Sequence, residues 1–124
     1  MNSLFIESTN YTPGVKFTSE GKLTIYGKSL MEDTALFYQP LIQWINDCIL
    51  KKIEFVIKLD YLNTSSSQQI SKLLLLAKDN PKIQDYIVNW YYEIEDEEGL
   101  DFGKELEYIT DFQFNFLEYS AVEV

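Results

Sequence analysis

The hydrophobic and polar positions along the chain change their spacing several times. Where every second residue is apolar, the pattern predicts a strand, and where apolar residues recur three or four positions apart, it predicts a helix. The 124 residues then give the order ββαβαβαβ after an irregular lead-in at 1–12. Strands are expected at 15–17, 23–25, 54–60, 87–93 and 112–118. Helices are expected after Asp33, at about 65–79 and, irregular around Gly103, near 100–109.

The first expected helix contains a conflict. Asp33 is a candidate N-cap, and the apolar stripe behind it would consist of Leu36, Phe37, Leu41, Trp44, Ile45, Cys48 and Ile49. Pro40 lies inside this stripe, and proline removes an N–H donor and clashes one turn back. We therefore expect either a kink at Pro40 or a regular helix that starts near Gln39. Cys48 is expected to pack in the core as a small hydrophobic residue.

The alternation along the strands indicates a sheet with one covered face. In 54–60 and 112–118 the apolar side chains point one way, and polar side chains such as Lys58 and Asp60 point the other way. Strands buried on both faces would instead read as continuous apolar runs. We predict a single α/β domain over 1–124, with a mixed five-stranded sheet, helices mainly on one face and a partly open polar face. The first two strands should form a hairpin around Gly21.

A run of hydroxyl side chains separates the strand at 54–60 from the second helix. The run is Asn63-Thr64-Ser65-Ser66-Ser67, and it would lie at a helix N-terminus that follows the carboxyl end of a strand. The helix dipole and free N–H groups favour negative charge there, so a Thr or Ser in this run suits a phosphate. The alternative is plain capping, with Ser65 and Gln68 as a capping box. A single cap needs only one hydroxyl, and this run offers four.

Composition excludes several classes of protein. The net charge is −10, and six acidic residues fall between Glu93 and Asp101 with no base among them. All ten basic residues are lysines and they are not clustered, so we expect no nucleic-acid binding. No apolar run is long enough to span a bilayer, and the N-terminus lacks the features of a signal peptide. Because a single cysteine fits a reducing compartment, we expect a cytoplasmic protein without membrane insertion.

The side chains of common catalytic and cofactor sites are missing. The chain has no histidine, so a Ser-His or Cys-His nucleophile cannot form. It also has no Gly-rich phosphate loop. An EF-hand placed over the acidic patch would put Ile94 at the first ligand position, where an oxygen ligand is needed. We therefore expect no enzymatic activity, no metal site and no cofactor, and interpret the patch as a solvated loop or a contact for a basic partner.

An aromatic run occurs in the strand at 87–93. Alternate residues of a strand face opposite sides, so Trp90 and Tyr92 should join the core with Val88. Tyr91 would then point to the open face, where an exposed aromatic side chain is a possible anchor for a partner. Core packing of the whole run is the simpler interpretation.

Four segments together resemble the SiaC family of bacterial regulatory phosphoproteins. They are Tyr11-Thr12-Pro13-x-Val15-x-Phe17, Phe37-x-x-Pro40-Leu41-x-x-Trp44, Asp60-Tyr61-Leu62-Asn63-Thr64-Ser65-Ser66-Ser67 and Asn89-Trp90-Tyr91-Tyr92-Glu93. The resemblance covers nearly the whole chain, and the Asn-Thr-Ser-Ser-Ser run is its most specific element. Gln68 departs from the expected pattern, in which a basic residue follows the serines.

The resemblance implies a fold like that of anti-sigma-factor antagonists (STAS-like) and a phosphorylation switch. A serine/threonine kinase would modify Thr64, with Ser65, Ser66 and Ser67 as alternative sites, and a metal-dependent phosphatase would reverse the modification. The unmodified form would bind and activate a diguanylate cyclase and so raise cyclic di-GMP and promote biofilm. Partner contacts would come from Tyr91 and from the segment Asn63-Thr64-Ser65-Ser66-Ser67-Gln68. The alternative function is a small-molecule or nucleotide-binding module that holds a phosphate at the hydroxyl run.

Overall fold

A computed structural model of the chain describes residues 1–120. The elements in chain order are β1 Leu4–Ile6, β2 Gly14–Phe17, β3 Lys22–Ser29, α1 Thr34–Asn46, β4 Lys52–Leu62, α2 Thr64–Asp79, β5 Asp85–Glu93, α3 Glu97–Thr110 and β6 Gln113–Tyr119. The predicted mixed α/β class is confirmed, while the predicted number of strands was wrong, because the sheet has six. The last four residues of the expected 1–124 domain lie outside the described part of the chain.

The additional strand is β1, within the segment expected to be irregular. It pairs antiparallel with β2, so that Leu4 lies opposite Phe17 and Ile6 lies opposite Val15. Only three residues take part, and polar residues flank them on both sides. An alternation this short does not stand out in the sequence, which is why the pattern does not reveal this strand.

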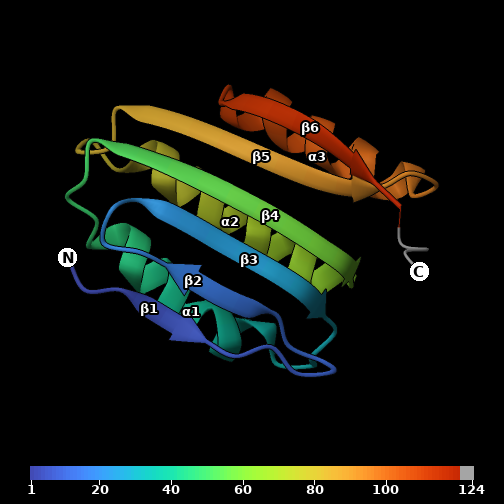
Figure 1. Cartoon of the computed structure of the whole chain (residues 1–124). Coiled ribbons are helices and arrows are strands. Elements are labelled where there is room, and N and C mark those ends of the chain that lie inside the picture. Colours follow the sequence, from blue (N-terminus) through green and yellow to red (C-terminus); the bar gives the residue numbers. More distant parts are fainter. Residues whose placement is uncertain (121–124) are drawn as a thin grey trace.

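The order of the strands places all helices on one side of the sheet. The strands lie in sequence order from β1 to β6; β1, β2 and β3 are antiparallel neighbours, and β3, β4, β5 and β6 are parallel neighbours. Crossovers between parallel strands are almost always right-handed. Three such crossovers that advance in the same direction put their helices on the same face, and Figure 1 shows α1, α2 and α3 together behind the sheet. The predicted one-sided arrangement is confirmed.

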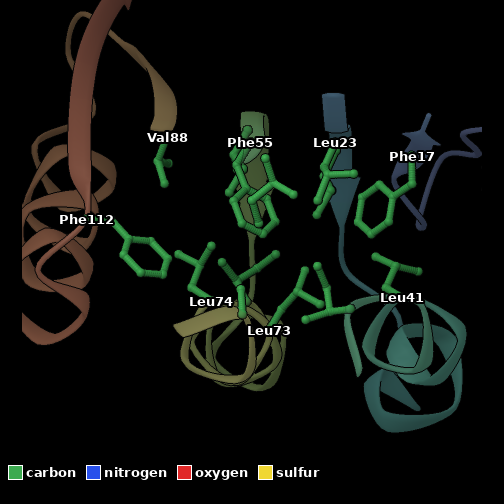
Figure 2. Packing of buried hydrophobic residues seen from close by; sticks show 14 of the residues in the cluster. Phe17, Leu23, Leu41, Phe55, Leu73, Leu74, Val88 and Phe112 are labelled. Carbon is green, nitrogen blue, oxygen red and sulfur yellow. The ribbon is translucent and has the colours of Figure 1, made fainter. Parts of the chain in front are cut away.

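The core lies between the sheet and these helices. Figure 2 shows Phe17, Leu23 and Phe55 pointing from the strands toward Leu41 of α1 and Leu73 of α2. All five side chains are buried. The opposite face carries a polar network instead, in which Asn115 Nδ2 donates to Asn89 Oδ1 and Asn89 Nδ2 donates to Glu54 Oε2. The polar, uncovered face that the alternation predicted is therefore present.

Helix α1 runs through Pro40 rather than starting at Gln39. As expected, Asp33 caps it, since its Oδ1 accepts a hydrogen bond of 3.0 Å from the N–H of Leu36. Pro40 is exposed, and the carbonyl that loses its donor belongs to Leu36, which is 67% exposed. Water can replace that hydrogen bond, so the proline is tolerated.

The buried stripe of α1 is narrower than the predicted one. It consists of Thr34, Tyr38, Leu41, Trp44 and Ile45, and it continues to Cys48 just beyond the helix. The predictions for Leu41, Trp44, Ile45 and Cys48 are confirmed. Leu36 and Ile49 were wrongly placed in the core, and both side chains are exposed. Leu36 lies two residues before Tyr38, on the opposite side of the helix, and Ile49 lies beyond the helix end at Asn46.

Helix α3 is longer and more regular than predicted. It begins within the acidic patch, where Asp96 is the N-cap, and it passes through Gly103 without interruption. A Cβ atom on Gly103 would lie 2.6 Å from Nε1 of Trp90. The expected irregularity at Gly103 was therefore wrong, and the glycine lets the helix approach the indole ring closely.

Candidate phosphorylation site and the adjoining cleft

Helix α2 starts one residue earlier than predicted and is capped by Asn63. Oδ1 of Asn63 accepts a 2.9 Å hydrogen bond from the N–H of Ser66, and its Nδ2 donates to the carbonyl of Met31. Among the described residues the predicted capping box between Ser65 and Gln68 does not form, because Asn63 is the N-cap and Ser65 lies inside the first turn of the helix. Asn63 thus joins the helix start to the segment that follows β3.

The four hydroxyls behind this cap lie in different environments. Thr64 is exposed, and within residues 1–120 its side chain makes no hydrogen bond. Ser65 is half-buried, and its Oγ donates to Oδ1 of Asn63 at 3.3 Å. Ser67 is half-buried too and donates to the Asn63 carbonyl at 3.2 Å. Ser66 is completely buried. A modifying enzyme would therefore meet Thr64 first.

Ser66 belongs to a buried cluster of hydroxyl groups. Its Oγ lies 2.7 Å from Oγ of Ser29, which in turn lies 2.7 Å from the phenol oxygen of Tyr38, and all three residues are 0% exposed. Burial raises the pKa of the Tyr38 phenol to about 12, although the hydrogen bond with Ser29 acts in the opposite direction. The cluster fixes the start of α2 to the end of β3 and to α1. Ser66 is thus a structural residue in this conformation, even though the sequence offered it as an alternative site.

A cleft lies next to Thr64, where β4 and β5 separate. Their pairing runs from Lys52 opposite Asp85 to Ile57 opposite Trp90 and then ends, although both strands continue. Figure 1 shows the two strands diverging toward their carboxyl ends. The cleft at this end has a volume of about 970 Å³, and the residues that line it include Lys58, Asp60, Tyr61, Thr64, Ser67, Tyr91, Glu93, Asp96, Glu98 and Tyr119.

The cleft brings together three of the residues singled out from the sequence. Thr64 and Ser67 lie on its α2 side and Tyr91 lies on its β5 side, consistent with the predicted direction of the Tyr91 side chain. Gln68 is exposed but outside the cleft, and Asn63, Ser65 and Ser66 do not line it either. Trp90 is buried and Tyr92 half-buried, so the predicted core role fits Trp90 better than Tyr92.

The rest of the cleft was not predicted from the sequence. Tyr119 Oη donates a 2.8 Å hydrogen bond to Oδ1 of Asp60 and so reaches from β6 to β4 across the carboxyl end of β5, where Tyr119 pairs with Glu93. Burial, and then the contact with Asp60, raise the pKa of Tyr119, which keeps the phenol protonated as a donor. The alternation that placed Lys58 and Asp60 on the open face was a usable signal for these two residues. Nothing local indicated that β4 and β5 would separate.

The cleft carries net negative charge. Asp60, Glu93, Asp96 and Glu98 line it, against Lys58 as the single base among the lining residues. No group of three or more acidic or cysteine side chains within 1–120 is arranged to hold a metal ion. In the same part of the chain, no helix combines the length and apolar character needed to cross a membrane.

Three solved structures share this fold. The chain aligns with SiaC of Pseudomonas aeruginosa at 24% identity, with a TM-score of 0.81 over 96% of this chain and 100% of that one. The structure of apo-SiaC from the same organism gives a TM-score of 0.79 at 24% identity over 94% and 99% of the chains. A third, described as the diguanylate cyclase SiaD in complex with its activator SiaC from Pseudomonas aeruginosa, gives 0.80 at 24% identity over 94% and 99%.

The family comparison is more specific than the shared fold. No curated protein sequence matches the chain. The model of the SiaC family of regulatory phosphoproteins, however, matches residues 6–119, which include the hydroxyl run, all cleft-lining residues except Ser120, and nearly every element of the sheet. The chain therefore belongs to the SiaC family of regulatory phosphoproteins.

Proposed function

We propose that this chain is a non-enzymatic partner-switching regulator that is controlled by phosphorylation of Thr64. The observation that carries the proposal is the contrast within the hydroxyl run: Thr64 is exposed and without a hydrogen-bond partner in residues 1–120, while Ser66 is buried and doubly bonded. The unmodified form binds and activates an effector, and phosphorylation blocks that binding.

The position of Thr64 suits a reversible charge. It is the first residue of α2, and the first turn of this helix contains no acidic residue. Phosphorylation adds about −1.5 to −2 charges, and negative charge at a helix N-terminus is stabilising by about 0.3–1 kcal/mol. The fold therefore tolerates the modification, and its effect falls on the surface that a partner would contact.

Large exposed side chains near Thr64 support the proposed effect of phosphorylation on docking. Tyr61, on the strand just before α2, is 60% exposed. Leu30 is 39% exposed, and it follows Ser29, whose carbonyl accepts a 3.2 Å hydrogen bond from the N–H of Asn63. A partner that covers these side chains would also desolvate a phosphate on Thr64, at a cost in binding free energy. A loss of about 2–3 kcal/mol corresponds to a roughly 30- to 150-fold weaker complex.

The family and the solved complex support the choice of partners. SiaC of Pseudomonas aeruginosa is the activator of the diguanylate cyclase SiaD in the structure with the same fold. By this likeness the effector of our chain is a diguanylate cyclase, and its output is cyclic di-GMP signalling in biofilm formation. A serine/threonine kinase adds the phosphate in the cytoplasm, and a metal-dependent phosphatase removes it.

The alternative of a nucleotide-binding module is less favoured by the charges. A nucleotide phosphate at the hydroxyl run would lie in a cleft lined by Asp60, Glu93, Asp96 and Glu98, with Lys58 as the only base among the lining residues. Like charges at close range oppose such binding. A covalent phosphate, transferred by a kinase, does not depend on affinity for a free anion.

The test uses Thr64→Ala and Thr64→Glu in the full chain. Both should stay folded, Thr64→Ala should resist phosphorylation and bind the effector, and Thr64→Glu should bind it more weakly. Intact-mass measurement and peptide mapping after incubation with the kinase locate the phosphate, and calorimetry with the cyclase measures binding. Ser71→Ala serves as the matched control, because it removes a hydroxyl two turns further along α2, outside the run, and should change neither result. A phosphate on Ser65, Ser66 or Ser67 would refute the assignment to Thr64.

A further inference from the structure

The cleft already holds a cation between aromatic rings. Nζ of Lys58 lies 4.5 Å from the ring centroid of Tyr119 and 5.9 Å from that of Tyr91. Both distances are within the range of cation–π attraction. The three residues come from β4, β6 and β5, so this contact spans the place where the sheet separates. The walls of the cleft are thus arranged to hold an ammonium group.

Carboxylates in the same cleft exceed what Lys58 can neutralise. Asp60 already accepts a hydrogen bond from Tyr119, and Glu93, Asp96 and Glu98 also line the space. Aromatic faces combined with unneutralised carboxylates select organic cations, because the rings attract the charge and pack against the carbon chain that carries it.

We propose that this cleft binds an organic cation, an ammonium or guanidinium group on an extended aliphatic chain. Its volume of about 970 Å³ is ample for a linear polyamine. The cation comes either from a free amine or from an Arg or Lys side chain of a docked protein, and the chemistry of recognition is the same. The cation site shares its cleft with Thr64, but it does not rest on the proposed phosphorylation, because it binds the unmodified chain and needs no kinase.

Three variants test the site. Lys58→Met removes the resident cation and one positive charge, so ligand affinity should increase. The pair Asp60→Asn and Glu93→Gln removes two cleft carboxylates and should weaken binding about tenfold or more. The amide introduced by Asp60→Asn keeps an oxygen that can accept from Tyr119, so the fold should persist, as circular dichroism will check. The control pair Glu20→Gln and Asp79→Asn makes the same change of charge at exposed positions outside the cleft.

The full-length unmodified chain is titrated with spermidine, with agmatine and with an arginine-containing peptide. Calorimetry gives the affinity and NMR follows the indole N–H of Trp90, at about 150 mM salt to screen contacts that depend only on net charge. At least one probe should bind. Its affinity should be highest for Lys58→Met, intermediate for the wild-type chain and lowest for the variant with Asp60→Asn and Glu93→Gln. Binding of the peptide alone, in the same order, assigns the cation to a partner protein.

Two results would overturn the proposal. The first is equal weakening by the cleft pair and the control pair, which would show that only the net charge of −10 attracts the amines. The second is no binding by any of the three probes to the wild-type chain and to Lys58→Met. Neither result bears on Thr64, since no phosphorylated protein and no cyclase enter the titration.

Discussion

Helices α2 and α3 begin in the same way but carry different charges. Each follows a parallel strand, and in each an Asx side chain accepts a 2.9 Å hydrogen bond from the N–H three residues later, from Ser66 to Asn63 and from Gly99 to Asp96. The next residues are Glu97 and Glu98 in α3, but they are uncharged hydroxyl residues in α2. Helix α3 therefore has fixed negative charge near the positive end of its dipole, whereas α2 has none there, and this is where we propose the reversible phosphate.

The two helix starts are also anchored by different chemistry. In α3, Nε1 of Trp90 donates a 3.0 Å hydrogen bond to the carbonyl of Gly99, and Gly103 packs against the indole ring. In α2, the buried hydroxyl cluster of Ser66, Ser29 and Tyr38 takes this role. The hydroxyl cluster holds Ser66 inside while Thr64, two residues earlier, stays exposed, as the proposed phosphorylation requires.

The largest expected effect separates two positions that lie two residues apart. Ser66→Glu would bury an unpaired carboxylate in a site that is 0% exposed, and we expect a loss of about 4 kcal/mol or more in the free energy of unfolding. Thr64→Glu should lose less than about 0.5 kcal/mol or gain stability, because the charge stays in water near the helix dipole. Urea denaturation measures both. Similar losses at the two positions would mean that the hydroxyls of the run do not differ as described.

The contribution of the buried hydroxyl cluster to the free energy of unfolding should depend on pH. The pKa of Tyr38 is about 12 in the folded chain, against 10.0 for a free phenol. The folded state keeps this proton longer than the unfolded state, so its contribution is complete below pH 10 and is lost as pH rises toward 12. At about 1.4 kcal/mol per pKa unit, the loss approaches about 3 kcal/mol.

Tyr38→Phe isolates that contribution. At pH 7 the variant should be less stable by about 1 kcal/mol, because one hydrogen bond to Ser29 is lost. Between pH 10 and 12 the wild type should lose its advantage and fall below the variant. Urea denaturation at several pH values gives the two curves, and parallel curves throughout this range would contradict a buried, protonated Tyr38.

The packing of α3 against the indole ring of Trp90 should be sensitive to a single added methyl group at Gly103. Gly103→Ala normally favours a helix by about 1 kcal/mol, but here the Cβ would lie 2.6 Å from Trp90 Nε1. Overpacking costs about 1–3 kcal/mol, which offsets the helix gain and leaves a net loss of up to about 2 kcal/mol. Thermal or urea unfolding measures this, with exposed Glu105→Ala on the same helix as control. A stabilised Gly103→Ala protein would show that the close approach to Trp90 is not tight.

Local patterns predicted the open sheet face, the start of a helix at the hydroxyl run and the side of Tyr91. They also contained an unused signal, because Ser66 lies four residues before Ile70 on the buried stripe of α2. The separation of β4 from β5, and the contact of Gly103 with Trp90, depend on how distant segments pack. Neither leaves a pattern within its own segment, so the sequence alone could not predict the cleft.

The smallest expected effect distinguishes the two caps. Asn63→Ala and Asp96→Ala should each cost about 0.5–2 kcal/mol, as loss of an N-cap usually does. Asn63 also donates from Nδ2 to the carbonyl of Met31, 3.2 Å away. Asn63→Ala should therefore lose up to about 1 kcal/mol more stability than Asp96→Ala. Urea denaturation at pH 7 compares the two variants. If Asp96→Ala costs as much or more, the hydrogen bond from Asn63 Nδ2 to Met31 adds no stability. The start of α2 is then held to the end of β3 by the hydroxyl cluster and by the hydrogen bond from the Asn63 N–H to the Ser29 carbonyl.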